Sequence, residues 1–227
     1  MTTSPVTWHQ DTELGVAYPP QPWHLGGRLS LTLWRVPTVD LPETFAAAVP
    51  SGAHPLATRG HTLVGTAFVR YAAGGVLSYD ELLAAVPVRD GRRVAITIGA
   101  IWVDSRASLA GGRRLWGIPK QLAEFDRAET SASLRVEAGA DGVPIAAATF
   151  ATGRPLPGRW TLRQRYAQHL DGHDHRSRSI GSSRVGLSRA QWRFTPDGPL
   201  GFLHGRDPLR SLEQRDLAIA FGIDARD

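Results

Sequence analysis

The 227-residue sequence predicts one α+β domain built mainly from β-strands, arranged as a barrel or a sandwich. Three observations lead to this fold class. Alternating or β-branched segments recur along the chain, only short stretches suit a helix, and no repeat, heptad pattern or strong linker divides the sequence. We therefore expect a single domain over residues 1–227, with residues 1–27 as an extended N-terminal arm.

The elements expected in the N-terminal part are an arm, a strand and a helix. The arm ends in the stretch 19–27, which is rich in proline and glycine and cannot continue a helix. Residues 28–37 alternate between leucines and more polar side chains, which predicts a strand with Arg28 on its more polar face. A proline and an acidic residue stand near the start of the alanine-containing stretch 41–49, which predicts a short helix.

Two strands and a second helix are expected in the middle of the chain. Residues 61–71 and 93–103 are rich in β-branched and apolar side chains and predict strands. Between them, the adjacent acids of Tyr79-Asp80-Glu81-Leu82-Leu83 interrupt the apolar pattern. Residues 105–115 suit a short helix, and the following Trp-Gly-Ile-Pro predicts a turn or an extended lead into Lys120.

The C-terminal half is expected to contain further strands. A turn signal at 139–142 lies between two apolar runs, so residues 134–152 predict a β-hairpin. Strands are also expected at 159–162 and 183–194, whereas residues 213–221 suit either a terminal strand or a helix.

The composition excludes several kinds of site and partner. The chain has no cysteine, so it holds no disulfide, no cysteine-ligated metal and no thiol nucleophile. Its net charge is only +5, and its basic isoelectric point follows from arginine's high pKa, so neither predicts nucleic-acid binding. No apolar run approaches the roughly 20 residues that span a bilayer, and residues 1–10 lack a signal-peptide pattern. We expect a cytoplasmic protein with neither a membrane nor a nucleic acid as partner.

Lys120 is a candidate nucleophile because it is the only lysine among 26 basic side chains. A primary amine can form an imine with a ketone, whereas arginine cannot. An apolar setting favours the neutral, nucleophilic form of an amine. The neighbours of Lys120 include the apolar residues Trp116, Ile118, Leu122 and Phe125. The alternative is a structural lysine that packs its stem at a strand end and extends its amine into solvent.

Residues 112–122, GRRLWGIPKQL, resemble the signature of the acetoacetate decarboxylase family, in which the lysine after this proline forms a Schiff base with a β-keto acid. Residues 78–81, Ser-Tyr-Asp-Glu, resemble the family's Tyr-x-Glu segment, whose glutamate lies in the active site. Residues 22–28 resemble the segment that carries the active-site arginine, and 189–209 resemble the C-terminal region. The resemblance implies a β-barrel-centred, mostly antiparallel α+β fold that assembles into homo-oligomers.

The resemblance also implies roles for individual residues. Lys120 would form the Schiff base, and Glu81 would move protons to and from it. Arg28 would bind a substrate carboxylate or orient Glu81. The residues expected to line the substrate site are Tyr79, Trp116, Ile118 and Gln121.

The family's decarboxylases carry a second lysine directly after the catalytic one, and this sequence has Gln121 there. Without that cation, activation of Lys120 would rest on desolvation. The favoured prediction is a cofactor-free carbon–carbon lyase that decarboxylates a β-keto acid. One alternative is an aldolase-dehydratase of secondary metabolism that condenses pyruvate or a similar keto acid with an aldehyde. Another is a barrel that binds or cyclises a hydrophobic metabolite without a covalent bond.

A histidine- and aspartate-rich stretch, HLDGHDH at 169–175, contains side chains that can ligate a metal. Its spacing matches no familiar metal motif, so we expect a solvated loop and no metal. Nearby arginines within 176–193 are interleaved with one aromatic residue, Trp192, which does not favour nucleic-acid binding.

Overall fold

The computed structural model of the chain describes residues 7–223. Its strands are β1 (His9–Asp11), β2 (Val16–Tyr18), β3 (Trp23–Pro37), β4 (Ala53–Pro55), β5 (Ala57–Thr58), β6 (His61–Tyr71), β7 (Tyr79–Asp90), β8 (Arg93–Val103), β9 (Lys120–Leu122), β10 (Glu124–Glu129), β11 (Ser133–Ala140), β12 (Val143–Ala151), β13 (Trp160–Leu170), β14 (His173–Phe194) and β15 (Arg210–Phe221). The α-helices are α1 (Glu43–Ala47) and α2 (Arg106–Trp116), and 3-10 turns lie at Thr38–Asp40 and Gly201–Leu203.

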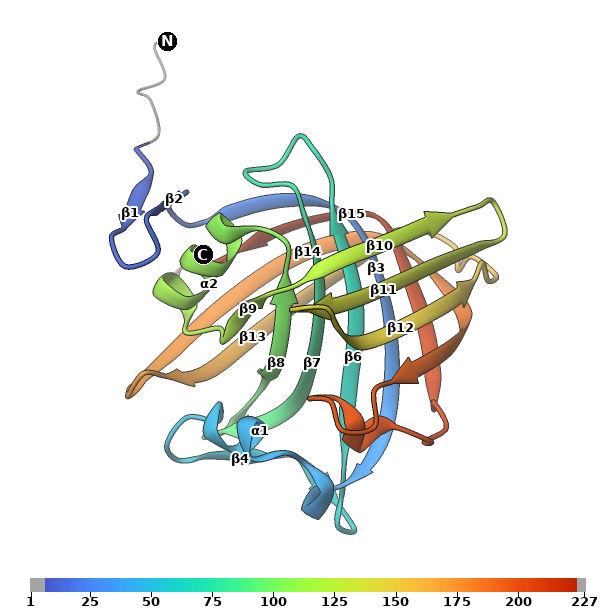
Figure 1. The fold of residues 1–227 in the computed structure, drawn as a ribbon. Coiled ribbons are helices and arrows are strands. Elements are labelled where there is room, and N and C mark those ends of the chain that lie inside the picture. The colour runs from blue at the N-terminus through green and yellow to red at the C-terminus, as the bar shows by residue number, and fades with distance from the viewer. Residues whose placement is uncertain (1–6, 224–227) are drawn as a thin grey trace.

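Long strands pair into a closed ring. Hydrogen-bonded neighbours follow the order β14, β13, β8, β7, β6, β3 and β15, and β15 pairs back onto β14 (Figure 1). Neighbours in the ring run antiparallel except β13 and β8, which share one parallel pair, Tyr166 with Ile96. The expected mostly antiparallel sheet with a few short helices is therefore confirmed.

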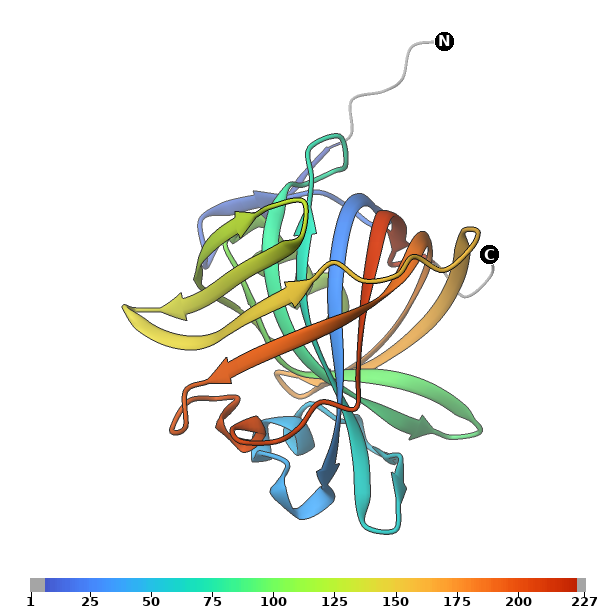
Figure 2. The ribbon, with the colours of Figure 1, turned by 90° about the vertical axis from the view of Figure 1, so that its right-hand side faces the viewer.

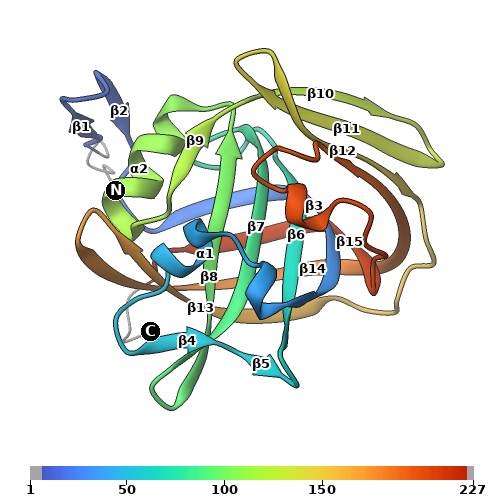
Figure 3. The ribbon, with the colours of Figure 1, turned by 60° about the horizontal axis from the view of Figure 1, so that its bottom comes forward.

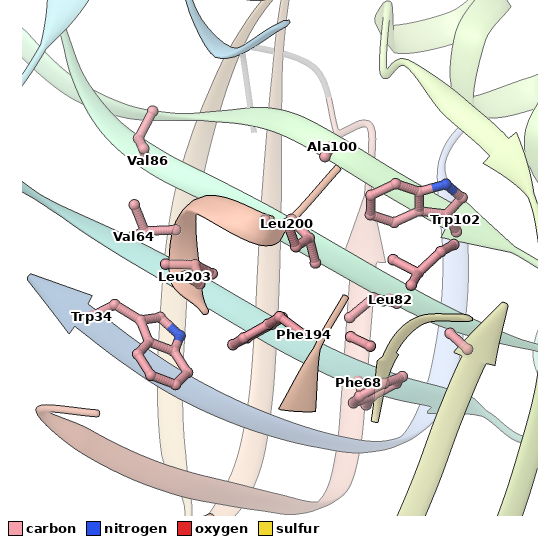
Figure 4. Packing of buried hydrophobic residues seen from close by; sticks show 14 of the residues in the cluster. Trp34, Val64, Phe68, Leu82, Val86, Ala100, Trp102, Phe194, Leu200 and Leu203 are labelled. Carbon is pink, nitrogen blue, oxygen red and sulfur yellow. The ribbon is translucent and has the colours of Figure 1, made fainter. Parts of the chain in front are cut away.

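A second layer covers part of one face of the ring. Strands β10, β11 and β12 extend the sheet from the C-terminal part of β14 and pass across the ring (Figures 1 and 2). A large apolar cluster joins the two layers, with Phe68 and Leu82 from the ring and Val136 and Phe150 from the added strands. Figure 4 shows Phe68 and Leu82 in this cluster.

Short elements complete the molecule around the ring. At one end, α1 lies beside the 3-10 turn at Gly201–Leu203 (Figure 3), and Phe45 packs edge-on against Phe202 at 5.5 Å between ring centroids. Near the other end, α2 and β9 adjoin the C-terminal end of β8 (Figure 1). A second apolar cluster forms beneath α2 on the other face of the sheet and includes Trp23, Tyr79, Ile101 and Trp116.

The structure corrects the expected N-terminal arm. Residues 1–6 of that arm lie outside the described residues. The next residues form the β1–β2 hairpin, and the strand expected from Arg28 already begins at Trp23 because β15 pairs with residues 23–27. The arm is thus replaced by a hairpin and the first part of a ring strand.

The remaining expectations differ in outcome. The strands expected at 61–71 and 93–103 match β6 and β8, and residues 213–221 belong to strand β15. The solvated loop expected at 169–175 was wrong: Asp171 and Gly172, both with positive φ, form a tight turn between β13 and β14. Within residues 7–223, no helix has the length and apolar character needed to cross a membrane.

Candidate active site

The alternation of side chains along β7 separates two adjacent acids. Asp80 pairs with Arg70 of β6, whereas Glu81 pairs with Val69 of β6 and Val103 of β8. Consecutive strand residues point to opposite faces of a sheet. Glu81 therefore faces the apolar cluster beneath α2, which contains Val69 and Val103, while Asp80 faces the opposite side.

The end of α2 directs Lys120 onto that same face. Gly117 adopts φ 61° at the helix C-cap, and its N–H and that of Ile118 donate to the carbonyls of Arg113 and Gly112. The chain then enters β9, where Lys120 pairs in parallel with Ile101 of β8. Because Ile101 belongs to the cluster beneath α2, Lys120 points into it.

Lys120 lies in a buried hydrogen-bonding site. The residue is 3% exposed, and its Nζ donates to Glu81 Oε2 at 2.9 Å and to Ser108 Oγ at 2.8 Å. Tyr79 contributes its hydroxyl at 3.5 Å and its ring, whose centroid lies 5.0 Å from Nζ. An amine and a carboxylate in direct contact can exchange a proton, which is the first requirement for lysine nucleophilic chemistry.

Helix α2 supplies two features that the sequence prediction missed. Ser108 is fully buried and presents its hydroxyl to Lys120. One helical turn later, a Cβ at Gly112 would lie 2.7 Å from Cδ of Lys120, so a larger residue there would displace the lysine stem from its present position. A glycine within a helix, one turn after a serine and shortly before the only lysine, is the signal that could have located both residues.

The charge of Glu81 acts on two buried tyrosines, Tyr79 and Tyr71. Burial raises the pKa of Tyr79 well above its usual value, and the negative charge of Glu81 raises it further. The same two causes raise the pKa of Tyr71, whose ring packs against Tyr79 with centroids 4.7 Å apart. Both hydroxyls therefore stay protonated at neutral pH, and Tyr79 can donate a hydrogen bond beside Lys120.

The structure brings Trp116 and Ile118 into the apolar cluster around this site. Both are buried in the cluster that contains Tyr79. Trp116 packs against Trp23 and Phe221, with ring centroids 4.8 and 4.5 Å away, and donates from Nε1 to the side chain of Gln21. Contact of Trp116 and Ile118 with a substrate remains a prediction.

Arg28 does not join Lys120 and Glu81. It pairs with Arg70 of β6, which in turn pairs with Asp80, so Arg28 shares the Asp80 face of the sheet. Its guanidinium forms an ion pair with Glu129 of β10. The expected position of Arg28 beside Glu81 is therefore corrected, because register places the two side chains on opposite faces.

Gln121 also points away from the site. It follows Lys120 in β9, is exposed, and pairs with Trp102, which belongs to the cluster between the two sheet layers. The expected substrate-lining role of Gln121 is corrected for this reason. Leu122, expected to be an apolar neighbour of the amine, is 45% exposed.

The histidine- and aspartate-rich turn has local partners. His169 Nδ1 lies 2.7 Å from Asp174 Oδ1, and His173 Nδ1 lies 2.8 Å from the carbonyl oxygen of Asp171. Among residues 7–223, no cluster of histidine, cysteine or acidic residues has the geometry of a metal site.

The fold and the buried pair define a class of protein: a ring-forming, mostly antiparallel sheet that holds one lysine against a glutamate. The sequence profile of the family "Acetoacetate decarboxylase (ADC)" matches residues 36–185. This chain therefore belongs to the acetoacetate decarboxylase family.

A curated relative and several solved structures are similar to this chain. "Acetoacetate decarboxylase 1" of Bradyrhizobium diazoefficiens is 34% identical over 109 residues, which are 47% of this chain and 40% of that protein. The match thus spans less than half the length of that relative.

The solved structures resemble this chain in fold. Acetoacetate decarboxylase of Legionella pneumophila superposes with a TM-score of 0.64 at 19% identity, covering 89% of this chain and 86% of that one. The enduracididine biosynthesis enzyme MppR, complexed with pyruvate, gives 0.61 at 16% identity, covering 89% and 87%. An acetoacetate decarboxylase-like enzyme of Sphingomonas wittichii RW1 gives 0.63 at 16% identity, covering 95% and 97%.

Proposed function

We propose that this protein is a cofactor-free carbon–carbon lyase in which Lys120 forms a Schiff base with a keto acid. The observation that supports this most directly is the contact of 2.9 Å between Lys120 Nζ and Glu81 Oε2 in a site from which solvent is almost excluded. Ser108 and Tyr79 hold the amine in one orientation from two further sides. Family membership supports the same chemistry.

In the proposed reaction, Glu81 takes a proton from the Lys120 ammonium, and the neutral amine adds to the substrate ketone. Glu81 then returns a proton to the carbinolamine hydroxyl, and water leaves as the protonated imine forms. In a β-keto acid, the electrons of the bond to the carboxylate move to the imine, which releases carbon dioxide and leaves an enamine. A proton from solvent, passed on by Glu81, then adds to the enamine carbon. Hydrolysis of the resulting imine by water releases the ketone and regenerates the amine of Lys120.

Decarboxylation is the favoured reaction because of the apolar side chains beside Lys120. A carboxylate among Trp116, Ile118 and Tyr79 loses hydration, and its departure as neutral carbon dioxide removes that cost. A tight pair between an arginine and the leaving carboxylate would instead stabilise the ground state. Arg28, the arginine expected to make such a pair, lies on the other face of the sheet.

Aldol condensation with dehydration is the second candidate function. The observation that favours it is the similarity in fold to MppR, whose structures include a complex with pyruvate and one with a condensation product of pyruvate and an aldehyde. The same imine at Lys120 would yield the nucleophilic enamine, and Glu81 would serve the dehydration step.

Borohydride trapping tests both candidates. Acetoacetate or pyruvate with borohydride should add one alkyl group to the intact protein, and Lys120→Arg should abolish this adduct. Because Lys120 is the only lysine, peptide mapping need separate it only from the α-amino group. No adduct at Lys120 with any keto acid between pH 6 and 8 would overturn the Schiff-base proposal and favour a ring that binds a metabolite without a covalent bond.

Carbon dioxide measurement separates the two reactions. Release from acetoacetate by the wild type, and its loss in Lys120→Arg, supports decarboxylation. Efficient trapping without carbon dioxide release supports condensation, which a panel of aldehydes with pyruvate would then test. Assembly into homo-oligomers and a cytoplasmic location are parts of this proposal, and sedimentation of the purified protein tests the first.

A further inference from the structure

A cleft of about 380 Å³ lies where the ring is least continuous. Its walls come from the start of β8, at Arg93 and Ala95, and from the facing parts of β13 and β14. Between β8 and β13 the backbone pairing is limited to Ile96 with Tyr166, so the two strands part on the side of Arg93. The end of α2 and residues 222–223 complete the wall.

Arginine side chains surround this cleft. Arg93, Arg165, Arg176 and Arg178 line it together with a single acid, Asp90. Arg176 engages that acid through two hydrogen bonds, of 2.9 and 3.0 Å. Within the described part of the chain, Arg93 and Arg165 have no ion pair. The cleft therefore carries excess positive charge.

Like charges stand close together in this cleft. Arg165 lies directly opposite Arg178 in the β13–β14 pair, and like charges in such positions repel. The charge of Arg178, followed by desolvation and the charge of Arg93, lowers the pKa of Arg165. Ser177 also lines the cleft, and its buried Oγ has no hydrogen-bond partner among residues 7–223. An anionic ligand beside Arg93 and Arg165 would offset the repulsion between these charges.

Two aromatic residues connect the cleft with the site of Lys120. Tyr166 and Trp116 line the cleft and also pack in the apolar cluster that contains Tyr79. Both rings contact Phe221, at centroid distances of 4.6 and 4.5 Å. The pKa of Tyr166 is raised to about 12 by burial, and the charge of Glu81 contributes to this increase. The inner wall of the cleft therefore belongs to the same apolar cluster as Tyr79, which contacts Lys120.

We propose that this cleft attracts the anionic substrate from solvent and is the entrance through which the substrate reaches Lys120. The ligand class is a small carboxylate, and its identity as a keto acid rests on the proposed function. Arg93 and Arg165 would attract the anion at the entrance, and Tyr166 and Trp116 would line its way to the apolar site, where the carboxylate leaves these arginines behind before it departs as carbon dioxide.

The test compares acetoacetate with its neutral methyl ester, which has the same carbonyl and no charge. The variant is Arg93→Gln with Arg165→Gln, and the control is Arg189→Gln, an exposed arginine of β14 outside the cleft. The rate of borohydride trapping at Lys120 is measured by intact mass for both ketones. We expect the double variant to trap acetoacetate about tenfold more slowly, with the ester changed less than about twofold, because a charged cleft concentrates an anion.

Equal slowing for both ketones, or no change for acetoacetate, would overturn the proposal. Binding of succinate, a dicarboxylate with no ketone, is measured in parallel by calorimetry on each protein. Succinate should bind the wild type and Arg189→Gln, and should lose at least about tenfold in affinity in the double variant. If neither ketone is trapped but succinate still binds and depends on the two arginines, the Schiff base is refuted and the anion cleft is supported. If succinate does not bind the wild type, the anion cleft is refuted.

Discussion

At the scale of residues, the environment of Lys120 depends on the face of the sheet to which each side chain points. Lys120 and Gln121 are adjacent, yet one is buried against Glu81 and the other is exposed. Asp80 and Glu81 are separated in the same way on β7. In the proposed reaction, the groups that activate Lys120 are therefore those on its own face, namely Glu81, Ser108 and the apolar side chains around them.

Gln121→Lys tests whether the position directly after Lys120 influences its reactivity. A cation there would extend from the opposite face of β9 and be screened by solvent, so the rate of trapping at Lys120 should change less than about twofold. The measurement is the borohydride trapping rate with acetoacetate, with peptide mapping to distinguish the two lysines. A tenfold faster reaction at Lys120 would contradict the assignment of faces, and Lys120→Arg is the control without adduct.

At the scale of elements, α2 is held to the N-terminal hairpin by Asp11 of β1. Its Oδ1 accepts the N–H groups of Glu13 and Leu14 at 3.1 and 2.9 Å, and its Oδ2 accepts Arg114 Nε of α2 at 2.8 Å. The hydrogen bond with Arg114, followed by that with the Leu14 N–H, lowers the pKa of Asp11 below its usual value of 3.8. The hydrogen bond between Asp11 and Arg114 thereby links the helix that carries Ser108 and Gly112 to the β1–β2 hairpin.

Asp11→Asn should reduce the free energy of unfolding by about 1 kcal/mol at pH 7, because it removes a charged hydrogen-bond acceptor. A depressed carboxyl pKa stabilises the fold above the unfolded-state pKa, and this contribution is lost as pH falls through the folded-state pKa. The difference between wild type and variant should therefore be constant near neutrality and decrease below about pH 4. Urea unfolding across pH measures it.

Asp141→Asn provides the matched control for that experiment, since Asp141 lies in the exposed β11–β12 turn. Asparagine also tolerates the positive φ of this turn position, so its substitution should have little effect at any pH. A difference for Asp11→Asn that grows on acidification would refute the proposed link.

Prediction of the elements from sequence succeeded where a segment carries its own pattern. The β6 and β8 strands are rich in apolar and β-branched residues, and the β11–β12 turn contains Asp141-Gly142 in the positive-φ region. It failed where pairing with a distant strand decided the outcome. Residues 23–27 contain two glycines and no strong strand pattern, but β15 supplies their hydrogen-bond partners.

At the scale of the whole molecule, closure of the ring depends on side chains at the parallel seam. Beside the pair of Tyr166 and Ile96, fully buried Gln168 of β13 accepts the Ile98 N–H at 2.6 Å and donates to the Ile98 carbonyl at 3.1 Å. Thr97 donates to the Ala167 carbonyl at 2.6 Å. These side chains replace the backbone ladder that the two strands lack.

Gln168→Leu should lower the free energy of unfolding by about 2–4 kcal/mol, because it leaves the buried N–H and carbonyl of Ile98 without partners. Urea denaturation measures the loss. The matched control is Gln191→Leu, the same substitution at an exposed position of β14, which should change stability by less than about 0.5 kcal/mol. Similar small effects for both variants would mean that the seam does not depend on Gln168.

The amino-acid sequence by itself determined the mostly β character of the chain, the short helix before Pro119, and Lys120 as the only lysine available for imine chemistry. These features depend on local periodicity, turn residues and composition, which are present in the chain before it folds. The sequence also places Tyr79 beside Glu81, since side chains two positions apart in one strand lie on the same face.

Only the tertiary structure decided which side chains meet at Lys120. Side-chain direction in a strand alternates with every residue, so the register of distant strands assigned Glu81 to the site and placed Arg28 and Gln121 on the other face. The same is true of Ser108, which reaches Lys120 because α2 packs over β9, and of the arginine cleft, which exists because β8 and β13 pair at a single point. Such contacts depend on pairing between segments far apart in sequence, which local patterns do not encode.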